Sequence, residues 1–169
     1  MVLEAQKRLD EAVPEYETAL TLNRNFAAAY AHMGYIKRSI GSPAEAIPPL
    51  EQAIRISPRD PDLGTWYEVI GRAHLMQGHI DEAVVWAERA RAYNPASPSL
   101  RALLAAGYAL KGESERGAAE LAEARRLSSD DRYSSISRLK TVVSFRPKAL
   151  ALYEPTYLTG LRKAGVPEE

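Results

Sequence analysis

Cysteine is absent from this chain of 169 residues, and long apolar runs and an excess of either charge are missing as well. Without cysteine the chain has no disulfide bond, no thiolate metal ligand and no cysteine nucleophile. The longest apolar run, Ala102 to Leu110, is too short to cross a bilayer, and no signal-peptide pattern opens the chain. Basic and acidic residues number 22 each, so no bulk charge indicates nucleic-acid binding. We therefore expect a cytoplasmic protein that neither inserts into a membrane nor binds nucleic acid.

Residue patterns that carry catalysis or metal binding are also missing. His74 and His79 lie five residues apart, but no cluster of carboxylates accompanies them. The sequence contains no glycine-rich phosphate loop, no G-x-S-x-G and no H-E-x-x-H. A solvated helix face accounts for the closely spaced glutamates Glu113, Glu115, Glu120 and Glu123. We expect no catalytic residue, no metal and no cofactor.

What the chain does contain is a period of about 34 residues. Three times, a small residue is followed seven positions later by a glycine: Gly34 by Gly41, Gly71 by Gly78, and Ala105 by Gly112. Small residues and a proline or serine then follow each glycine at matching distances: Ala46, Ala53 and Pro58; Ala83, Ala90 and Pro95; Gly117, Ala124 and Ser129. This register predicts units at 27–60, at 61–97 with a short insertion, and at 98–131.

Each unit predicts two antiparallel helices. Tyr30 and Met33 lie at helical spacing and form an apolar stripe on the first helix. Gly34 after that stripe lets the second helix approach closely, and Gly41 supplies a left-handed end to the first helix. The segment Ser42 to Glu45 predicts a capping box with proline at the first helical position.

These positions resemble the tetratricopeptide repeat (TPR), whose pattern is W-x2-L-G-x2-Y, then A-x3-F, then P. The resemblance covers Phe26 to Asp131, and its third unit is the most degenerate. It implies an all-α fold, an α-α superhelix that works as a non-catalytic module for protein–protein interaction. Members that clamp the acidic carboxyl terminus of heat-shock chaperones need lysine and asparagine where this chain has Ala31 and Tyr35. That class of partner is not expected.

The two ends depart from the repeat. Residues 1–26 predict an incomplete repeat, mainly its second helix from Leu9 to Leu22, after a stub of a first helix. We therefore expect either that the missing helix lies upstream in a longer protein or that another copy of the chain covers the open face. Residues 132–169 predict C-terminal capping helices, one from Ile136, another from Pro147, with a break at Glu154-Pro155.

A pair of prolines violates the helix rule inside the first full unit. Pro48 and Pro49 each lack a backbone donor and clash with the preceding turn. We expect a kink there, or a helix whose regular part begins near Pro48.

Two surfaces are candidates for a partner. By the geometry of the TPR family, the inner faces of the first helices form a concave surface. The candidate binding residues on it are Tyr35, Arg38, Thr65, Glu68, Arg72 and Met76. Beside them we expect Ala31, Ala102, Ala106 and Ala109. A run of basic residues offers the second surface, with Arg132, Arg138, Lys140 and Arg146 as its candidates. We favour a solvated surface as the explanation of that basic patch; the alternative is a docking site for an acidic partner or for an upstream domain.

The last residues, YLTGLRKAGVPEE from Tyr157, resemble the C-termini of bacterial class III adenylate cyclases that carry TPR tails. That resemblance implies a regulatory or assembly part of a larger signalling protein, whose partner would be the upstream catalytic domain or another copy of itself. Similar tails follow winged-helix regulators, so the alternative is the effector region of a transcription regulator.

Overall fold

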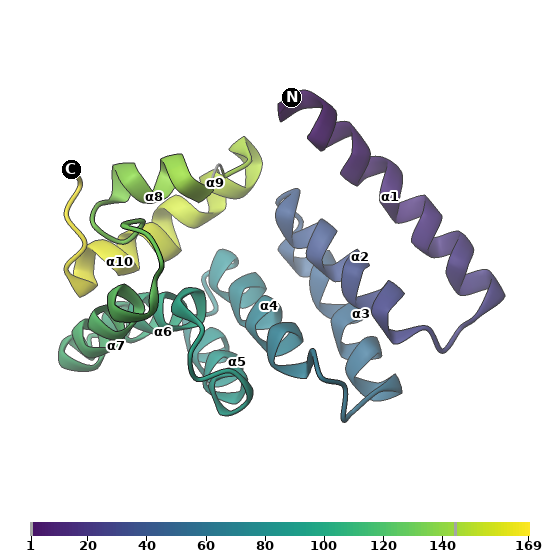
Figure 1. The fold of residues 1–169 in the computed structure, drawn as a ribbon, viewed down its shortest axis with the longest axis horizontal. Helices are drawn as coiled ribbons and strands as arrows, with labels where there is room; N and C mark the ends of the chain where they lie inside the picture. The colour runs from purple at the N-terminus through teal and green to yellow at the C-terminus, as the bar shows by residue number, and fades with distance from the viewer. Residues whose placement is uncertain (1, 144) are drawn as a thin grey trace.

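The computed structural model describes residues 2–143 and 145–169, with side chains from Ala12 onward, and every regular element in these ranges is helical (Figure 1). Seven helices form the first part: α1 (Val2–Leu22), α2 (Ala27–Ser39), α3 (Pro43–Ile56), α4 (Leu63–Met76), α5 (Ile80–Tyr93), α6 (Pro98–Leu110) and α7 (Ser114–Leu127). The C-terminal part consists of α8 (Ile136–Val143), α9 (Pro147–Tyr153), the π-helical turn η1 (Glu154–Leu158) and α10 (Thr159–Ala164).

Three helix pairs, α2 with α3, α4 with α5 and α6 with α7, make the most extensive contacts in the molecule. Successive pairs stack on each other through α3 and α4 and through α5 and α6. The result is the α-α superhelix that the period predicts, and two apolar cores run through it.

The repeated glycines act as contact and turn residues. Gly41, Gly78 and Gly112 have φ angles of +80°, +78° and +82°, the left-handed conformation that ends a helix. A Cβ atom added at Gly34 would lie 2.5 Å from Cγ of Leu50. The predicted close approach between the helices of a pair is confirmed.

The predicted capping box at the start of α3 is wrong. Pro43 occupies the first helical turn as expected, but the Ser42 side chain makes no capping hydrogen bond. Glu45 instead accepts a hydrogen bond from Nζ of Lys37 at 2.9 Å. Ser42 Oγ lies 3.4 Å from Nζ of Lys148, a residue far along the chain. Both side chains of the expected box thus pair with lysines of other helices.

The two prolines of α3 lie inside a continuous helix. The helix begins at Pro43, so a regular part that starts only near Pro48 is ruled out. Pro48 is exposed and Pro49 half-buried, whereas Leu50 directly after them is fully buried against Gly34. Packing of this apolar face holds the helix together despite two missing backbone donors.

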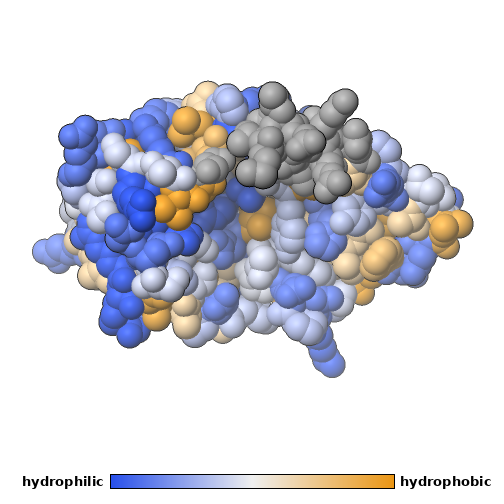
Figure 2. All heavy atoms as spheres, turned by 45° about the horizontal axis from the view of Figure 1, so that its top comes forward, coloured by the Kyte–Doolittle hydropathy of each residue, from blue (hydrophilic) through white to orange (hydrophobic). Residues whose placement is uncertain are grey.

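At the N-terminal end, α1 is one helix from Val2 to Leu22, without the separate stub of a first helix that we expected. It packs on α2. Leu22 is 86% exposed and Phe26 is 44% exposed, and apolar side chains are visible at the end of the molecule where α1 and α2 meet (Figure 2, right). Within the described residues no helix combines the length and hydrophobicity needed to span a membrane.

The C-terminal helices pack into the core. The helices expected from Ile136 and from Pro147 are both present. The expected break at Pro155 is absent, because a π-helical turn continues α9 into α10 and accommodates a residue without an N–H group. Backbone N–H groups of Ile136 and Ser137 donate to the carbonyls of Pro167 and Glu168, which ties the end of the chain to the start of α8.

Candidate functional site

The C-terminal helices lie across the face that was predicted to be the concave partner surface. α10 packs on α6, and α9 and η1 contact α4 (Figure 1). A Cβ atom at Gly160 of α10 would lie 2.6 Å from the carbonyl oxygen of Ala106. Ala102 and Ala106 are fully buried and Ala109 is 4% exposed. This part of the predicted surface is therefore covered by the chain itself.

A cavity of about 550 Å³ remains between the first helices and the C-terminal helices. Its volume falls within the range of small-molecule binding pockets. Four of the six candidate concave residues, Arg38, Thr65, Glu68 and Arg72, line one side. The other side consists of residues from the C-terminal segment, among them Tyr133, Leu139, Phe145, Arg146, Ala149, Tyr153 and Tyr157.

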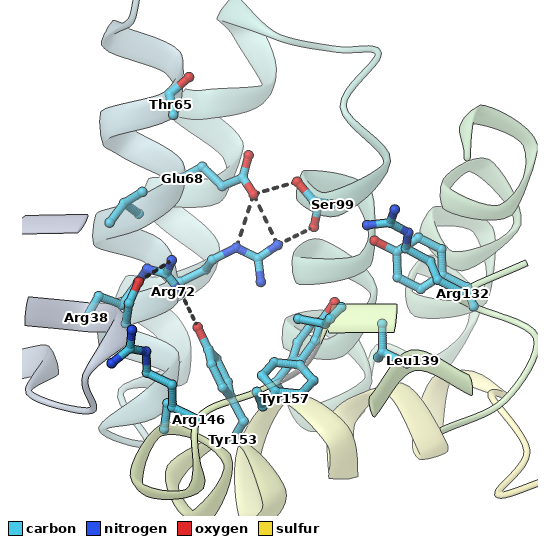
Figure 3. A pocket seen from close by; sticks show the side chains of 16 residues that line it. Arg38, Thr65, Glu68, Arg72, Ser99, Arg132, Leu139, Arg146, Tyr153 and Tyr157 are labelled. Atoms are coloured by element: carbon cyan, nitrogen blue, oxygen red, sulfur yellow. Dashed lines mark hydrogen bonds and ion pairs between the residues drawn. The ribbon is translucent and has the colours of Figure 1, made fainter. Parts of the chain in front are cut away.

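Arg72 ties three parts of the chain together at the centre of the cavity (Figure 3). Its guanidinium donates to Glu68 Oε1 at 3.1 Å and to the carbonyl oxygen of Ser99 at 2.7 Å. It also lies 5.4 Å from the ring centre of Tyr157. Burial alone would lower the pKa of Arg72, but the nearby Glu68 carboxylate raises it on balance. The Arg72 side chain is only 13% exposed, so its first role is structural.

Arg38 bridges the first full helix pair to the C-terminal helices. Its Nη1 donates to the hydroxyl oxygen of Tyr153 at 2.8 Å, and its Nη2 lies 3.4 Å from Ser39 Oγ. Its Nε is buried and has no hydrogen-bond partner among the described residues. One donor of this guanidinium is thus unsatisfied at the cavity wall.

Tyrosines form the apolar part of the wall. Tyr153 and Tyr157 pack edge to face with ring centres 5.6 Å apart. Burial raises the pKa of Tyr133 and of Tyr157, so both phenols stay neutral across the physiological range. The wall therefore offers rings and neutral hydroxyl groups, and the charges of the cavity come from the arginines and Glu68.

Two candidate concave residues lie outside this cavity. Met76 is buried in the core with an exposed fraction of 3%. Tyr35 is half-buried and packs edge to face against the exposed His32 ring. Burial, with Asp62 and Asp60 nearby, raises the pKa of Tyr35. The structure thus brings four of the six residues together, buries Met76 in the core and leaves Tyr35 near Trp66 at the start of α4.

The basic patch is largely paired with carboxylates. Arg132 pairs with Asp130 at 2.7 Å, Arg138 with Asp131 at 2.7 Å, and Lys140 with Glu154 at 3.0 Å. Arg132 and Arg146 line the cavity, whereas Arg138 and Lys140 do not. The four candidates do not form one surface of like charge.

Sequence reasoning missed the aromatic contribution to this site. The sequence predicted a break at Glu154-Pro155, which placed Tyr153 and Tyr157 in separate segments, whereas the π-helical turn η1 joins them. Their contact with Arg38 and Arg72 depends on how the C-terminal helices fold back, and the local sequence pattern does not encode that.

The two histidines considered as metal ligands lie near each other, with ring centres 5.8 Å apart. Across the part of the chain that the structure describes, no group of three or more potential metal-ligating side chains is present. Nδ1 of His74 is buried and lacks a hydrogen-bond partner there.

Comparison with known proteins identifies the repeat. Two models described as tetratricopeptide repeat match residues 39–107 and 1–26. No curated protein matches the sequence.

Solved structures share the fold at low sequence identity. A crystal structure of MamA is 20% identical with a TM-score of 0.68, covering 95% of this chain and 91% of that one. The crystal structure of YrrB, described as "a TPR protein with an unusual peptide-binding site", is 19% identical with a TM-score of 0.63, covering 97% and 83%. TTC0263, described as a thermophilic TPR protein in Thermus thermophilus, is 24% identical with a TM-score of 0.63, covering 96% and 86%. These structures show the α-α superhelix fold that the chain shares with them, and the two tetratricopeptide-repeat models, which together match 95 of its 169 residues, identify it as a tetratricopeptide-repeat protein.

Proposed function

We propose that this chain is a non-catalytic protein-interaction module that binds a peptide segment of its partner in the cavity between α2, α4 and the C-terminal helices. One observation carries the proposal. Arg38, Thr65, Glu68 and Arg72, chosen as partner-binding residues from the repeat alone, line a single cavity of about 550 Å³. TPR proteins typically work as scaffolds for protein or peptide partners, and this cavity is the part of the concave face that α10 leaves open.

A peptide-display experiment tests this proposal. Random twelve-residue peptides are selected on the full chain, and selected peptides are then measured against the variant Thr65→Trp. Thr65 is exposed at the cavity wall, so an indole there fills space that a peptide would need. We expect Thr65→Trp to abolish binding of most selected peptides.

The matched control is Thr21→Trp, which adds the same side chain at an exposed position of α1. It should leave peptide binding unchanged. Selected peptides that bind Thr65→Trp as tightly as the unaltered chain would contradict the proposal, as would a selection that yields no binding peptide.

We propose further that the repeats divide at 27–60, 61–97 and 98–131, and that the chain is a cytoplasmic regulatory or assembly part of a larger bacterial signalling protein. The resemblance of its ending to class III adenylate cyclases with TPR tails supports this assignment. The partner would then be the upstream catalytic domain or another copy of the chain. Reading the parent gene tests the idea: a cyclase domain upstream supports it, and a winged-helix domain contradicts it and favours the effector region of a transcription regulator.

A further inference from the structure

Basic side chains outnumber acidic side chains among the described residues that line the cavity. Among the described residues that line it are four arginines, Arg38, Arg72, Arg132 and Arg146, and a single carboxylate, Glu68. Glu68 is already engaged, because it accepts hydrogen bonds from Arg72 and, at 2.8 Å, from Ser99 Oγ. The acid that pairs with Arg132 is Asp130, which is not part of the lining. The lining therefore has an excess of positive charge.

Arg38 is the arginine best placed to receive an anion. Its hydrogen-bond partners are the hydroxyl groups of Tyr153 and Ser39, and among the described residues its Nε has no partner. In the described part of the chain no carboxylate pairs with it. Figure 3 shows Arg38, Arg146 and Tyr153 at the same end of the cavity, with Arg72 held toward Glu68 and Ser99. A planar guanidinium with an unused Nε–H matches a group with two acceptor oxygens.

We propose that the cavity binds a carboxylate side chain of an acidic peptide, and that Arg38 is the residue that recognises it. The inference rests on the proposed peptide-binding function and adds the chemical class of the peptide. The carboxylate would replace the uncharged hydroxyl partners of Arg38 with an ion pair. The tyrosine rings and Phe145 would contact the methylene groups behind the carboxylate.

Three fluorescein-labelled octapeptides test the proposal by fluorescence anisotropy with the full chain. One alternates glutamate with leucine, the second has glutamine in place of glutamate, and the third has phosphoserine. We expect the glutamate peptide to bind about tenfold more tightly than the glutamine peptide, and less tightly as salt is raised. Equal binding of these two peptides would overturn the proposal. A phosphoserine peptide that binds far more tightly than the glutamate peptide would overturn the assignment of a carboxylate.

Matched variants locate the binding to Arg38. Arg38→Gln should weaken the glutamate peptide about tenfold, and Arg59→Gln, which removes the same charge from an exposed loop outside the cavity, should not. Tyr153→Phe keeps the ring but removes the hydroxyl that occupies Nη1 of Arg38, so the glutamate peptide should bind this variant more tightly than it binds the unaltered chain. Circular dichroism melting checks that each variant is folded. Equal losses in Arg38→Gln and Arg59→Gln would overturn the role of Arg38, and so would a tenfold loss in a folded Tyr153→Phe.

The carboxylate proposal can be wrong while the proposed peptide-binding function is right, and the experiments distinguish the two cases. Selected peptides that bind in the cavity without any preference for acidic residues would leave the peptide-binding function intact and overturn the carboxylate. The absence of any cavity-dependent peptide would overturn both.

Discussion

At the scale of single residues, the sequence predicted those positions whose roles follow from backbone geometry. Gly41, Gly78 and Gly112 adopt the left-handed conformation, and Gly34 and Gly71 allow close helix contact. Side-chain partners were less predictable. Glu45 pairs with Lys37 and not with the backbone at Ser42, because a charged partner from the adjacent helix competes with the local cap. Spacing along the chain contains no information on that competition.

Replacing Gly71 with leucine should overpack the α4–α5 pair. A Cβ atom at this position would already lie 3.1 Å from the carbonyl oxygen of Ala83 and 3.3 Å from the backbone nitrogen of Ala87. We expect Gly71→Leu to lower the free energy of unfolding by about 1–3 kcal/mol or more, measured by urea denaturation. Ala92→Leu, at an exposed position of α5, is the control and should change it little. Equal stability of the two variants would show that Gly71 is not a close-contact position.

His74 should make stability depend on pH between 7 and 5. Burial lowers the pKa of His74 below its usual value of 6.5, and Glu82 offsets this only in part. The unfolded chain then takes up the proton more readily, so stability is full above about pH 6.5 and declines as the pH falls through the pKa of the folded state.

Urea denaturation at a series of pH values measures this effect. The decline between pH 7 and 5 should be smaller in His74→Gln than in the unaltered chain. His32→Gln, which changes an exposed histidine, should keep the decline because His74 is still present. The same decline in His74→Gln would show that other groups cause it.

At the scale of helices and turns, the period predicted the pairing of helices because each pair needs an apolar stripe, a close contact and a turn at fixed distances. The exceptions occur where one residue breaks a rule that packing then overrides. Pro48 and Pro49 lie within α3, and Pro155 within a π-helical turn, although isolated proline usually ends or bends a helix. Leu50 beside the two prolines packs on Gly34 of α2, and Tyr157 beside Pro155 lies near Arg72 of α4, so the local sequence alone did not predict the outcome.

Gly160 should control the docking of α10 on α6. A Cβ atom there would lie 2.6 Å from the carbonyl oxygen and 2.8 Å from the Cα of Ala106, and backbone atoms cannot rotate away. We expect Gly160→Ala to lower stability by about 1–3 kcal/mol and to speed amide hydrogen exchange in α8, α9 and α10. Exchange in α2 and α3 should change least.

The control for this prediction is Ala151→Ser, which adds one atom at an exposed position of α9. It should leave hydrogen exchange unchanged. If exchange in the C-terminal helices is as slow in Gly160→Ala as in the control, the close packing of α10 on α6 is incorrect.

At the scale of the whole molecule, the sequence predicted the superhelix and the existence of C-terminal helices, but not that these helices cover the concave face. Repeat patterns encode contacts between neighbouring units, whereas the contacts of Tyr153 with Arg38 and of Gly160 with Ala106 join segments far apart in the chain. Hence the arginines chosen from the repeat appear in the cavity, and the tyrosines that face them were not recognised.

The central claim is that the C-terminal helices reach back to the first full helix pair and so close the cavity. The lack of cysteine makes this directly measurable, because an introduced pair of cysteines has no competing thiol. Lys148 Nζ lies 3.4 Å from Ser42 Oγ, so Ser42→Cys with Lys148→Cys should be joined efficiently by a short bifunctional maleimide in the native protein. Ser42→Cys with Glu169→Cys is the control, since the end of the chain lies away from α2 and α3 (Figure 1). The account predicts rapid cross-linking of the first pair that is lost in urea; cross-linking no faster than in the control pair would contradict it.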